Sequence, residues 1–306
     1  MPGFRQAQIK SNLYLRQAVI AAIRDFFAKA DFLEVQTPVR MAAPAPEPHI
    51  DAVAADGGWL QTSPELYMKR LIAAGYDKVF QICSCFRQGE RGRRHLPEFT
   101  MLEWYGARMD YRDLMEQTET LIHYVCRKVR KKDHLIYQGR NIDLTPPWPK
   151  LSVAEAFDRY GQMDMAAALA EDRFDEQITM SVAPRLDAGR PVILYDFPAE
   201  RTPLAKTSSD NPDLAQRFEL YVAGMELCNA FSELTDAAEQ RRRFETELYR
   251  RKTAGRPEYP MPAAFLDALA HMPEAAGNAL GLDRLVMLFA DTDCIDDVTA
   301  FVPEEH

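Results

Sequence analysis

The sequence predicts an α+β fold in which an antiparallel sheet is flanked by helices. Residues 79–85 and 99–105 alternate apolar with other side chains, which is the period of a β-strand, and a loop joins them. Residues 217–234 read as a β-hairpin. Residues 12–29 carry apolar side chains at helical spacing, and residues 110–132 form a second long helical stretch.

The remaining elements can be assigned in chain order. In the first helix we expect an inward-facing stripe made of Leu15, Val19, Ile23, Phe26 and Phe27. The helix over residues 62–71 has Pro64 in its first turn and Ser63 as a possible cap. We then expect a strand at 136–144 that ends before the prolines of 146–149, helical patches in 152–176, a buried strand at 192–197 and a charged helix at 236–251.

Length and composition predict one large domain. The chain has 306 residues, 47% of them hydrophobic, and we expect the domain to span residues 1–306 with a small helical insertion around residues 150–190. No apolar run approaches the length of a membrane span, and residues 1–10 lack a signal-peptide core, so we expect a cytoplasmic protein without a membrane partner. The five cysteines lack paired metal-ligand spacing, which favours reduced, structural thiols.

A formal net charge of -9 argues against broad binding to nucleic acid, because that affinity comes from clustered Lys and Arg. Any contact with a polyanion must therefore be local. The candidate segment is residues 86–105, F-R-Q-G-E-R-G-R-R-H-L-P-E-F-T-M-L-E-W-Y. Arg87 ends the first strand, and Arg91, Arg93 and Arg94 fill the loop with planar guanidinium groups that suit nucleotide phosphates. The alternative is a solvated run of charge.

A second segment strengthens the phosphate interpretation. Residues 277–289 read G-N-A-L-G-L-D-R-L-V-M-L-F, a strand of small residues that leads into an apolar helix with Arg284 at the junction. Small residues let the backbone approach a ligand closely.

Two glutamates of the hairpin predict a metal site. A turn near residues 222–224 sets Glu219 and Glu226 opposite or diagonal to each other. Like charges so placed repel unless a cation bridges them, and Mg²⁺ bound with ATP is the natural candidate because it prefers hard oxygen ligands. The alternative is a pair of exposed glutamates on a solvent face.

The sequence also predicts an acidic pocket. Asn229 and Glu233 share one strand face, and we expect Glu65 and Glu103 to approach Glu233 near Tyr105. Such a pocket suits ammonium groups and is hostile to an acidic side chain.

Three segments together resemble the class II aminoacyl-tRNA synthetases. The F-R and P-E-F-T of residues 86–100 resemble motif 2 of that family, and G-N-A-L-G-L-D-R at 277–284 resembles motif 3. Residues 32–41, F-L-E-V-Q-T-P-V-R-M, are similar to motif 1, with Pro38 in its expected place. The resemblance implies a class II catalytic domain over nearly the whole chain, a homodimer formed through motif 1, and no anticodon-binding domain before it.

The same resemblance implies roles in ATP binding. Arg87 would bind the α-phosphate and the substrate carboxylate, and Arg284 would bind the γ-phosphate; these two are the expected catalytic residues. Phe99 would stack on adenine, with His95 near the nucleotide. Glu226, with Glu219, would hold the Mg²⁺ of ATP. Positioning and charge stabilisation would supply the rate.

Three stretches, T-S-P-E-L-Y-M-K-R-L, E-F-T-M-L-E-W-Y and E-L-C-N-A-F-S-E-L, resemble the lysyl-tRNA synthetases. The resemblance implies that the substrate amino acid is bound by Glu65, Glu103, Tyr105, Asn229 and Glu233. Two further positions, Ser63 and Ala279, match the truncated paralogues that ligate (R)-β-lysine to elongation factor P. They imply (R)-β-lysine or lysine as donor, elongation factor P as acceptor and little activity on tRNA, with the Ala279 methyl shaping the pocket floor.

Departures from the family pattern keep other interpretations open. Gly89 stands where motif 2 usually has a glutamate, so Glu90 either takes over its contact or the contact is lost. Leu96 and Ala230 also differ from the usual Asn and Gly. The alternatives are a minimal lysyl-tRNA synthetase-like enzyme that uses α-lysine and a regulatory paralogue with impaired catalysis. A ligase that makes a small-molecule amide would need a pocket for an acidic substrate, which the three glutamates oppose.

Overall fold

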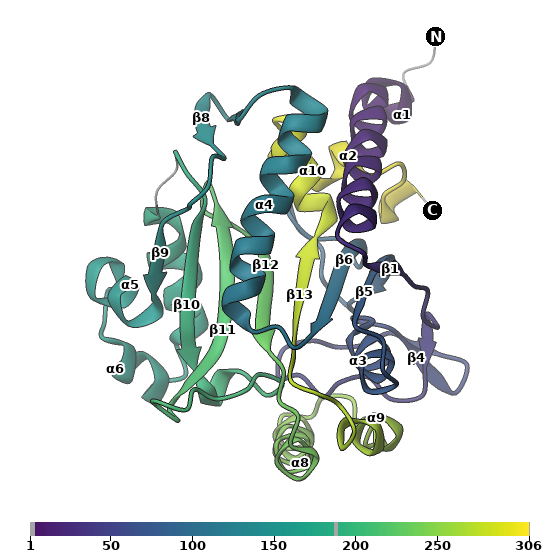
Figure 1. Cartoon of the computed structure of the whole chain (residues 1–306), viewed down its shortest axis with the longest axis vertical. Helices are drawn as coiled ribbons and strands as arrows, with labels where there is room; N and C mark the ends of the chain where they lie inside the picture. The colour runs from purple at the N-terminus through teal and green to yellow at the C-terminus, as the bar shows by residue number, and fades with distance from the viewer. Residues whose placement is uncertain (1–3, 187–188, 306) are drawn as a thin grey trace.

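The computed structural model describes residues 4–186 and 189–305, and a mixed sheet lies at the centre of this part of the chain (Figure 1). Its eight strands, in spatial order, are β1 (Leu33–Glu34), β5 (Lys78–Phe86), β6 (Glu98–Ala107), β13 (Ala275–Gly281), β12 (Met225–Ser232), β11 (Leu214–Val222), β10 (Val192–Pro198) and β9 (Lys150–Ser152). The pairs β1–β5 and β9–β10 at the two edges are parallel, and all pairs between them are antiparallel. The predicted α+β class with flanking helices is confirmed.

Side chains of β6 alternate between the two faces of the sheet, as the sequence predicts. Leu102 and Trp104 are buried in the main apolar core. Glu103 and Tyr105, which point the other way, line a cavity. The site therefore lies on the face opposite the main core.

Three helices cover the core face of the sheet: α2 (Lys10–Lys29), α4 (Tyr111–Arg130) and α10 (Leu282–Ala290) (Figure 1). Val19, Ile23 and Phe27 of α2 are fully buried, while Leu15 and Phe26 pack at the edge of the core. The start of α4 is fixed by a capping box, since the Asp110 carboxylate accepts the N–H groups of Arg112 and Asp113 and Asp113 caps in return.

The walls of the site come from a second group of elements. The helices α3 (Glu65–Ala73), α8 (Ala237–Thr253) and α9 (Ala263–Leu269) share an apolar cluster beside Tyr105. A small sheet of β2 (Arg40–Met41), β4 (Gly58–Leu60) and β3 (Ala54–Ala55) precedes α3. Helix α3 starts after Pro64, and the Ser63 hydroxyl accepts the N–H of Glu65 at 3.0 Å.

The prediction of a single strand at residues 136–144 is wrong. The segment is a hairpin of β7 (His134–Tyr137) and β8 (Arg140–Asp143). Gln138 and Gly139 between them have φ values of 50° and 75°. This left-handed backbone makes a tight two-residue turn, which glycine favours, so the chain reverses where the apolar pattern suggested continuity.

The helical segment expected around residues 150–190 consists of α5 (Val153–Tyr160), α6 (Met165–Ala170) and α7 (Phe174–Gln177), then a π-helical turn (Ile178–Val182) and a 3₁₀ turn (Ala183–Arg185). It packs its own apolar cluster against β10. The short helix α1 (Arg5–Gln8) and 3₁₀ turns at Ala199–Arg201, Ile295–Val298 and Pro303–Glu305 complete the described elements.

Two absences concern residues 4–186 and 189–305 only. No helix there is long and apolar enough to cross a membrane. All five cysteines are free thiols.

Candidate active site

A cavity of about 470 Å³ opens on the face of the sheet away from the main core. Strands β6, β11, β12 and β13 form its walls. The start of α3, Asp283 and Arg284 at the start of α10, and the loop that contains Glu47 complete them. The residues predicted from the sequence to bind ATP, metal or amino acid line it with one exception, Glu233: the lining includes Ser63, Glu65, Arg87, Glu90, His95, Phe99, Glu103, Tyr105, Glu219, Glu226, Asn229, Ala279 and Arg284. Glu233 itself lies just behind this lining, against Lys69.

The first polar group of the site is built around Arg87, directly after β5. The Arg87 N–H donates to the Pro97 carbonyl at 2.9 Å, which closes the neck of the loop between β5 and β6. Its guanidinium carbon lies 5.0 Å from the centre of the Phe99 ring, a cation–π contact. Glu90 lies 3.8 Å from the same guanidinium. Gly89 has a φ of 77°, a conformation suited to glycine, and this turn brings Glu90 rather than residue 89 to the cavity.

Arg284, at the start of α10, lines the same cavity as Arg87. Its guanidinium donates to the Glu226 carbonyl at 2.8 Å and to Nε2 of His95 at 2.6 Å. Desolvation lowers the pKa of His95, and the positive charge of Arg284 lowers it further. A neutral imidazole can accept from Arg284, which has only donors. His95 therefore orients the guanidinium.

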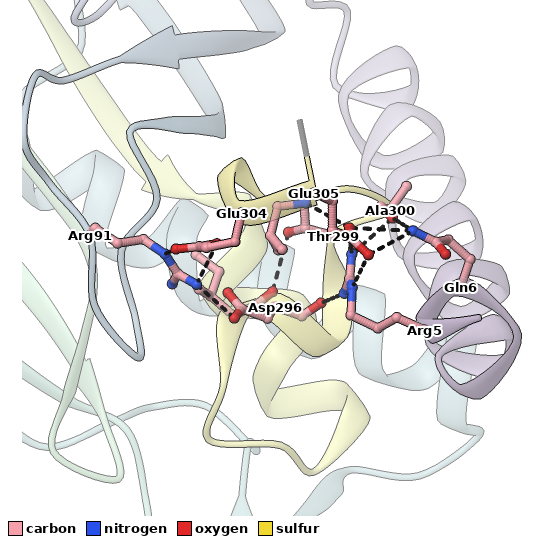
Figure 2. Close-up of polar contacts among 10 residues, drawn as sticks. Arg5, Gln6, Arg91, Asp296, Thr299, Ala300, Glu304 and Glu305 are labelled. Carbon is pink, nitrogen blue, oxygen red and sulfur yellow. Dashed lines mark hydrogen bonds and ion pairs between the residues drawn. The ribbon is translucent and has the colours of Figure 1, made fainter. Parts of the chain in front are cut away.

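Not all the loop arginines face the cavity. Arg94 lines it. Arg91, by contrast, bonds to Asp296 and Glu304 at 2.8 Å each (Figure 2), and Arg93 bonds to Asp293. Arg91 is thereby directed to the C-terminal segment. The prediction that the whole arginine run faces phosphate is wrong for Arg91 and Arg93, because acidic side chains distant in sequence satisfy them.

A β-bulge brings Glu226 to the cavity face. Tyr221 pairs with Glu226 and Leu220 with Cys228, so Leu227 is the extra residue of β12. Without this extra residue, Glu226 would share the core-facing side with Cys228. With it, Glu226 lies diagonal to Glu219, which pairs with Asn229, as the sequence predicts.

Glu219 has partners that the sequence did not reveal. Its carboxylate accepts from Arg217 at 2.5 Å and from the Tyr221 hydroxyl at 2.6 Å. Burial raises the pKa of Glu219 to about 7, with Arg217 opposing the shift and Glu226 adding to it. The described residues contain no group of three or more His, Cys, Asp or Glu side chains placed to hold a metal ion. Two adjacent carboxylates fit Mg²⁺ only if phosphate oxygens complete its shell.

The second polar group surrounds Glu103, whose side chain is fully buried. The Ser63 hydroxyl donates to one carboxylate oxygen at 2.5 Å, and the Tyr105 hydroxyl donates to the other at 2.7 Å. Burial raises the pKa of Glu103 to about 8, and the charge of Glu65 contributes to the shift. A cation that enters this group restores the ionised form.

Sequence reasoning missed Lys69, which is central to the second group. Its ammonium is buried between the carboxylates of Glu65 and Glu233 and lies 5.0 Å from the Phe231 ring centre. Burial lowers the Lys69 pKa, but Glu233 and Glu65 raise it more, so the ammonium stays charged. The i, i+4 spacing of Glu65 and Lys69 was the available signal.

Glu233 keeps a capacity for a further donor. Burial raises its pKa to about 8, with Lys69 opposing and Glu65 adding to the shift. Among the described residues, no hydrogen-bond donor of suitable geometry reaches either carboxylate oxygen, although Lys69 forms an ion pair with one of them. Buried polar atoms normally have a partner, so the arrangement favours a bound ammonium.

The floor of the site is β13. Ala279 pairs with Glu103 on one side and with Asn229 on the other. A Cβ on Gly277 would lie 2.2 Å from the Tyr105 ring and 2.6 Å from a Glu233 oxygen. Only glycine fits at position 277, because the side chains of Tyr105 and Glu233 occupy the space that a Cβ would need. The sequence had instead suggested that a ligand approaches closely there.

Comparison with known proteins agrees with this architecture. Residues 3–305 match the family of class II tRNA synthetases (D, K and N). The chain belongs to this family.

Two kinds of relative stand out by name. The chain is 41% identical to the elongation factor P–(R)-β-lysine ligase of Pectobacterium carotovorum subsp. carotovorum (strain PC1), over 96% of this chain and 95% of that protein. It is 40% identical to the protein of the same name from Erwinia tasmaniensis, over 95% and 94%. It is also 37% identical to the lysine–tRNA ligase of Moorella thermoacetica, over 96% of this chain and 65% of that protein.

Proposed function

We propose that this protein is an ATP-dependent ligase that activates (R)-β-lysine, or lysine, as an aminoacyl-adenylate and transfers it to a lysine side chain of elongation factor P. The observation that carries the proposal is one cavity that joins the first polar group, the arginine group of Arg87 and Arg284, to the second, the buried acidic group around Glu103. The chain is also 41% identical over nearly its full length to a ligase of that name. The proposal includes a cytoplasmic location, where ATP and elongation factor P occur together.

The charges of the acidic group support a donor with two amino groups. Glu65, Glu103 and Glu233 supply three carboxylates, and Lys69 supplies one internal ammonium. If all four ionise, a net charge of about two negative units remains, which two substrate ammonium groups neutralise. An acidic substrate would be repelled. This opposes the interpretation as an amide ligase of the asparagine synthetase type.

The arginine group supports the activation step. Arg87 and Arg284 both line the cavity. In this proposal Arg87 would bind the donor carboxylate and the α-phosphate, and Arg284 would bind the terminal phosphate. The carboxylate oxygen attacks the α-phosphorus, and pyrophosphate leaves. Glu219 and Glu226 would hold Mg²⁺, which supplies charge neutralisation on the phosphates. No residue needs to become a covalent nucleophile.

The direct test is modification of elongation factor P. Purified protein with ATP and Mg²⁺ is offered (R)-β-lysine or α-lysine, and intact-protein mass spectrometry follows the factor while acid precipitation follows tRNA charging. We expect one added β-lysyl group on one lysine of the factor and poor tRNA charging. Robust charging of tRNA without a mass shift on the factor would instead identify a minimal lysyl-tRNA synthetase-like enzyme.

We assign the choice between (R)-β-lysine and α-lysine to Ala279 on the floor of the site. The Ala279 methyl lies between Glu103 and Asn229, so it limits how the donor backbone sits over β13. Ala279→Gly should shift preference toward α-lysine by about 1–3 kcal/mol in relative kcat/KM, the range for one methyl group. Unchanged discrimination in pyrophosphate exchange would remove Ala279 from this role.

We also propose a homodimer formed through residues 32–41, as the family resemblance implies. Leu33 and Val39 in this segment are exposed in the single chain, at 50% and 43%. Exposed apolar side chains grouped on one segment favour burial against a partner.

A further inference from the structure

A carboxylate outside the donor subsite, which we define as Glu65, Lys69, Glu103 and Glu233, also lines the cavity. Glu47 lies on the loop between β2 and β3 and lines the cavity together with Glu65 and Arg87. Its side chain is partly buried, yet within the described residues its carboxylate forms no hydrogen bond and no ion pair. A carboxylate held in a cleft without a partner is available to a ligand.

The backbone around Glu47 is fixed from outside the cavity. The buried Arg251 guanidinium of α8 donates to the carbonyls of Glu47 at 2.7 Å and Ile50 at 2.9 Å and to the Asp51 carboxylate at 2.6 Å. The Gln88 N–H, next to Arg87, donates to the Asp51 carbonyl at 2.8 Å. The backbone that carries Glu47 is thus held in a set position relative to the end of β5, which supports a catalytic position for its side chain.

The loop that carries Glu47 borders a second cavity. This cavity, of about 530 Å³, is lined by the next two residues, Pro48 and His49, and by Arg201 and Arg250, all of which line the first cavity too. A side chain that crosses from the second cavity into the first would therefore pass beside Pro48 and His49, which follow Glu47. This is a route for an acceptor that does not cross the donor subsite.

The electrostatic surroundings suit a proton acceptor near neutral pH. Burial raises the pKa of Glu47 to about 7, the charge of Glu65 adds to the shift, and Arg87, Arg217 and Lys69 oppose it. Other charged or titratable groups around the two cavities are His49, Asp172, Asp175, Glu200, Arg201, Glu247, Arg250 and Arg256.

The transfer step of the proposed function needs such a group. A lysine side chain has an ordinary pKa of about 10.4, so at neutral pH it is an ammonium ion without a lone pair for attack. We propose that Glu47 is the general base of transfer and takes a proton from the acceptor ammonium as it enters from the second cavity. This inference rests on the proposed function.

The step balances as follows. One N–H proton of the acceptor ammonium moves to a Glu47 oxygen, and the freed lone pair forms a C–N bond to the adenylate carbonyl carbon. The bond from that carbon to the phosphate oxygen breaks, and AMP leaves with the electron pair. The second proton lost by the nitrogen passes to solvent, which leaves a neutral amide.

The experiment separates the two half-reactions in Glu47→Gln, Glu47→Asp and a control, Asp56→Asn. Asp56 is an exposed acid of the neighbouring β3–β4 turn, so the control also removes one negative charge. For each variant, lysine-dependent pyrophosphate exchange reports activation, and the mass shift of elongation factor P reports transfer. Hydroxylamine, a nucleophile that is largely neutral at pH 7, reports adenylate capture without a base.

We expect Glu47→Gln to keep exchange and hydroxylamine capture within about threefold of the parent while transfer at pH 7 falls by about a hundredfold, the usual contribution of a general base. Its transfer rate should rise as pH increases toward 10, whereas the parent should reach a plateau earlier. Glu47→Asp should retain part of the transfer activity.

Three outcomes would overturn the inference. A parallel loss of exchange would place Glu47 in the donor subsite, unchanged transfer would leave it without a role, and equal losses with hydroxylamine would point to a structural effect. The parent protein tests the proposed function separately. If it does not modify the factor, the proposed function itself is wrong, whatever the variants do.

Discussion

Individual charges at the acidic end of the cavity would favour the proposed substrate with two amino groups. Glu103 and Glu233 both have pKa values raised to about 8, chiefly by burial. Lys69 pairs with both Glu65 and Glu233, and its positive charge offsets the repulsion between these two buried carboxylates. The pocket without substrate therefore remains open and favours cations.

Glu233→Gln tests the pairing of a carboxylate with the substrate ammonium. The amide keeps the shape of the side chain but removes its charge, so we expect a loss of about 2–4 kcal/mol in kcat/KM for lysine and for (R)-β-lysine, as when one side of a buried charge pair is removed. Pyrophosphate exchange measures this loss, and circular dichroism checks the fold. An unchanged catalytic efficiency would show that Glu233 does not contact the donor.

Raised carboxyl pKa values also predict a pH dependence of donor binding. The free pocket holds protons on Glu103 and Glu233 below about pH 8, and a bound ammonium lowers both pKa values, so binding releases protons. Affinity should rise between pH 6 and 8, by up to about tenfold per pH unit for each proton released, and level off above. Calorimetry in two buffers of different ionisation enthalpy measures the proton release, and equal heats would contradict it.

Arg284→Ala tests the phosphate end of the cavity. The substitution removes the guanidinium that His95 and the Glu226 carbonyl orient, and solvent cannot replace it in a closed site. We expect adenylate formation to be abolished while the thermal unfolding curve stays close to that of the parent. Pyrophosphate exchange within a few-fold of the parent would show that the assignment of residues 277–284 to ATP binding is wrong.

At the scale of elements, the C-terminal segment connects the first helix to the loop between β5 and β6 (Figure 2). Arg5 of α1 donates to the carbonyls of Asp296 and Thr299 and to the Glu305 carboxylate. On the other side, Arg91 of the loop bonds to Asp296 and Glu304. The last residues of the described chain thus hold the outer edge of the loop between β5 and β6.

Arg91→Ala should loosen this loop with little effect on the fold. Its ion pairs are exposed, so the free energy of unfolding should fall by about 1 kcal/mol or less, while amide hydrogen exchange over residues 88–95 accelerates. Arg242→Ala, which breaks the exposed Arg242–Glu239 pair on α8 away from the loop, is the matched control. Equal exchange in the parent and in Arg91→Ala would mean that the C-terminal contacts do not restrain the loop.

For the whole molecule, the proposed homodimer makes a prediction about mass. Light scattering at micromolar concentration should give twice the mass of one chain, and Val39→Asp should reduce it to that of one chain by placing a charge in the interface. Ile136→Asp, at another exposed apolar residue on β7, should leave the mass unchanged. A parent protein that is monomeric in this measurement would contradict the dimer.

The sequence by itself determined the α+β class, the alternation of β6 that places Glu103 and Tyr105 on one face, and the residues that gather at the cavity. These features depend on periods of two and 3.6 residues and on short motifs, which are local properties. The hairpin of residues 134–143 was missed because its turn depends on backbone angles at Gln138 and Gly139 rather than on a change of apolar pattern.

Only the tertiary structure decided which charges meet. Lys69 pairs with Glu233, and Arg91 pairs with Glu304, across separations of 164 and 213 residues respectively by numbering. The bulge at Leu227, which turns Glu226 toward the cavity, is a matter of register between two strands. Such contacts are set by how the sheet and helices pack, and no spacing within the chain encodes them. The place of Glu47 in the cavity wall has the same origin, since Arg251, 204 residues away, fixes its loop.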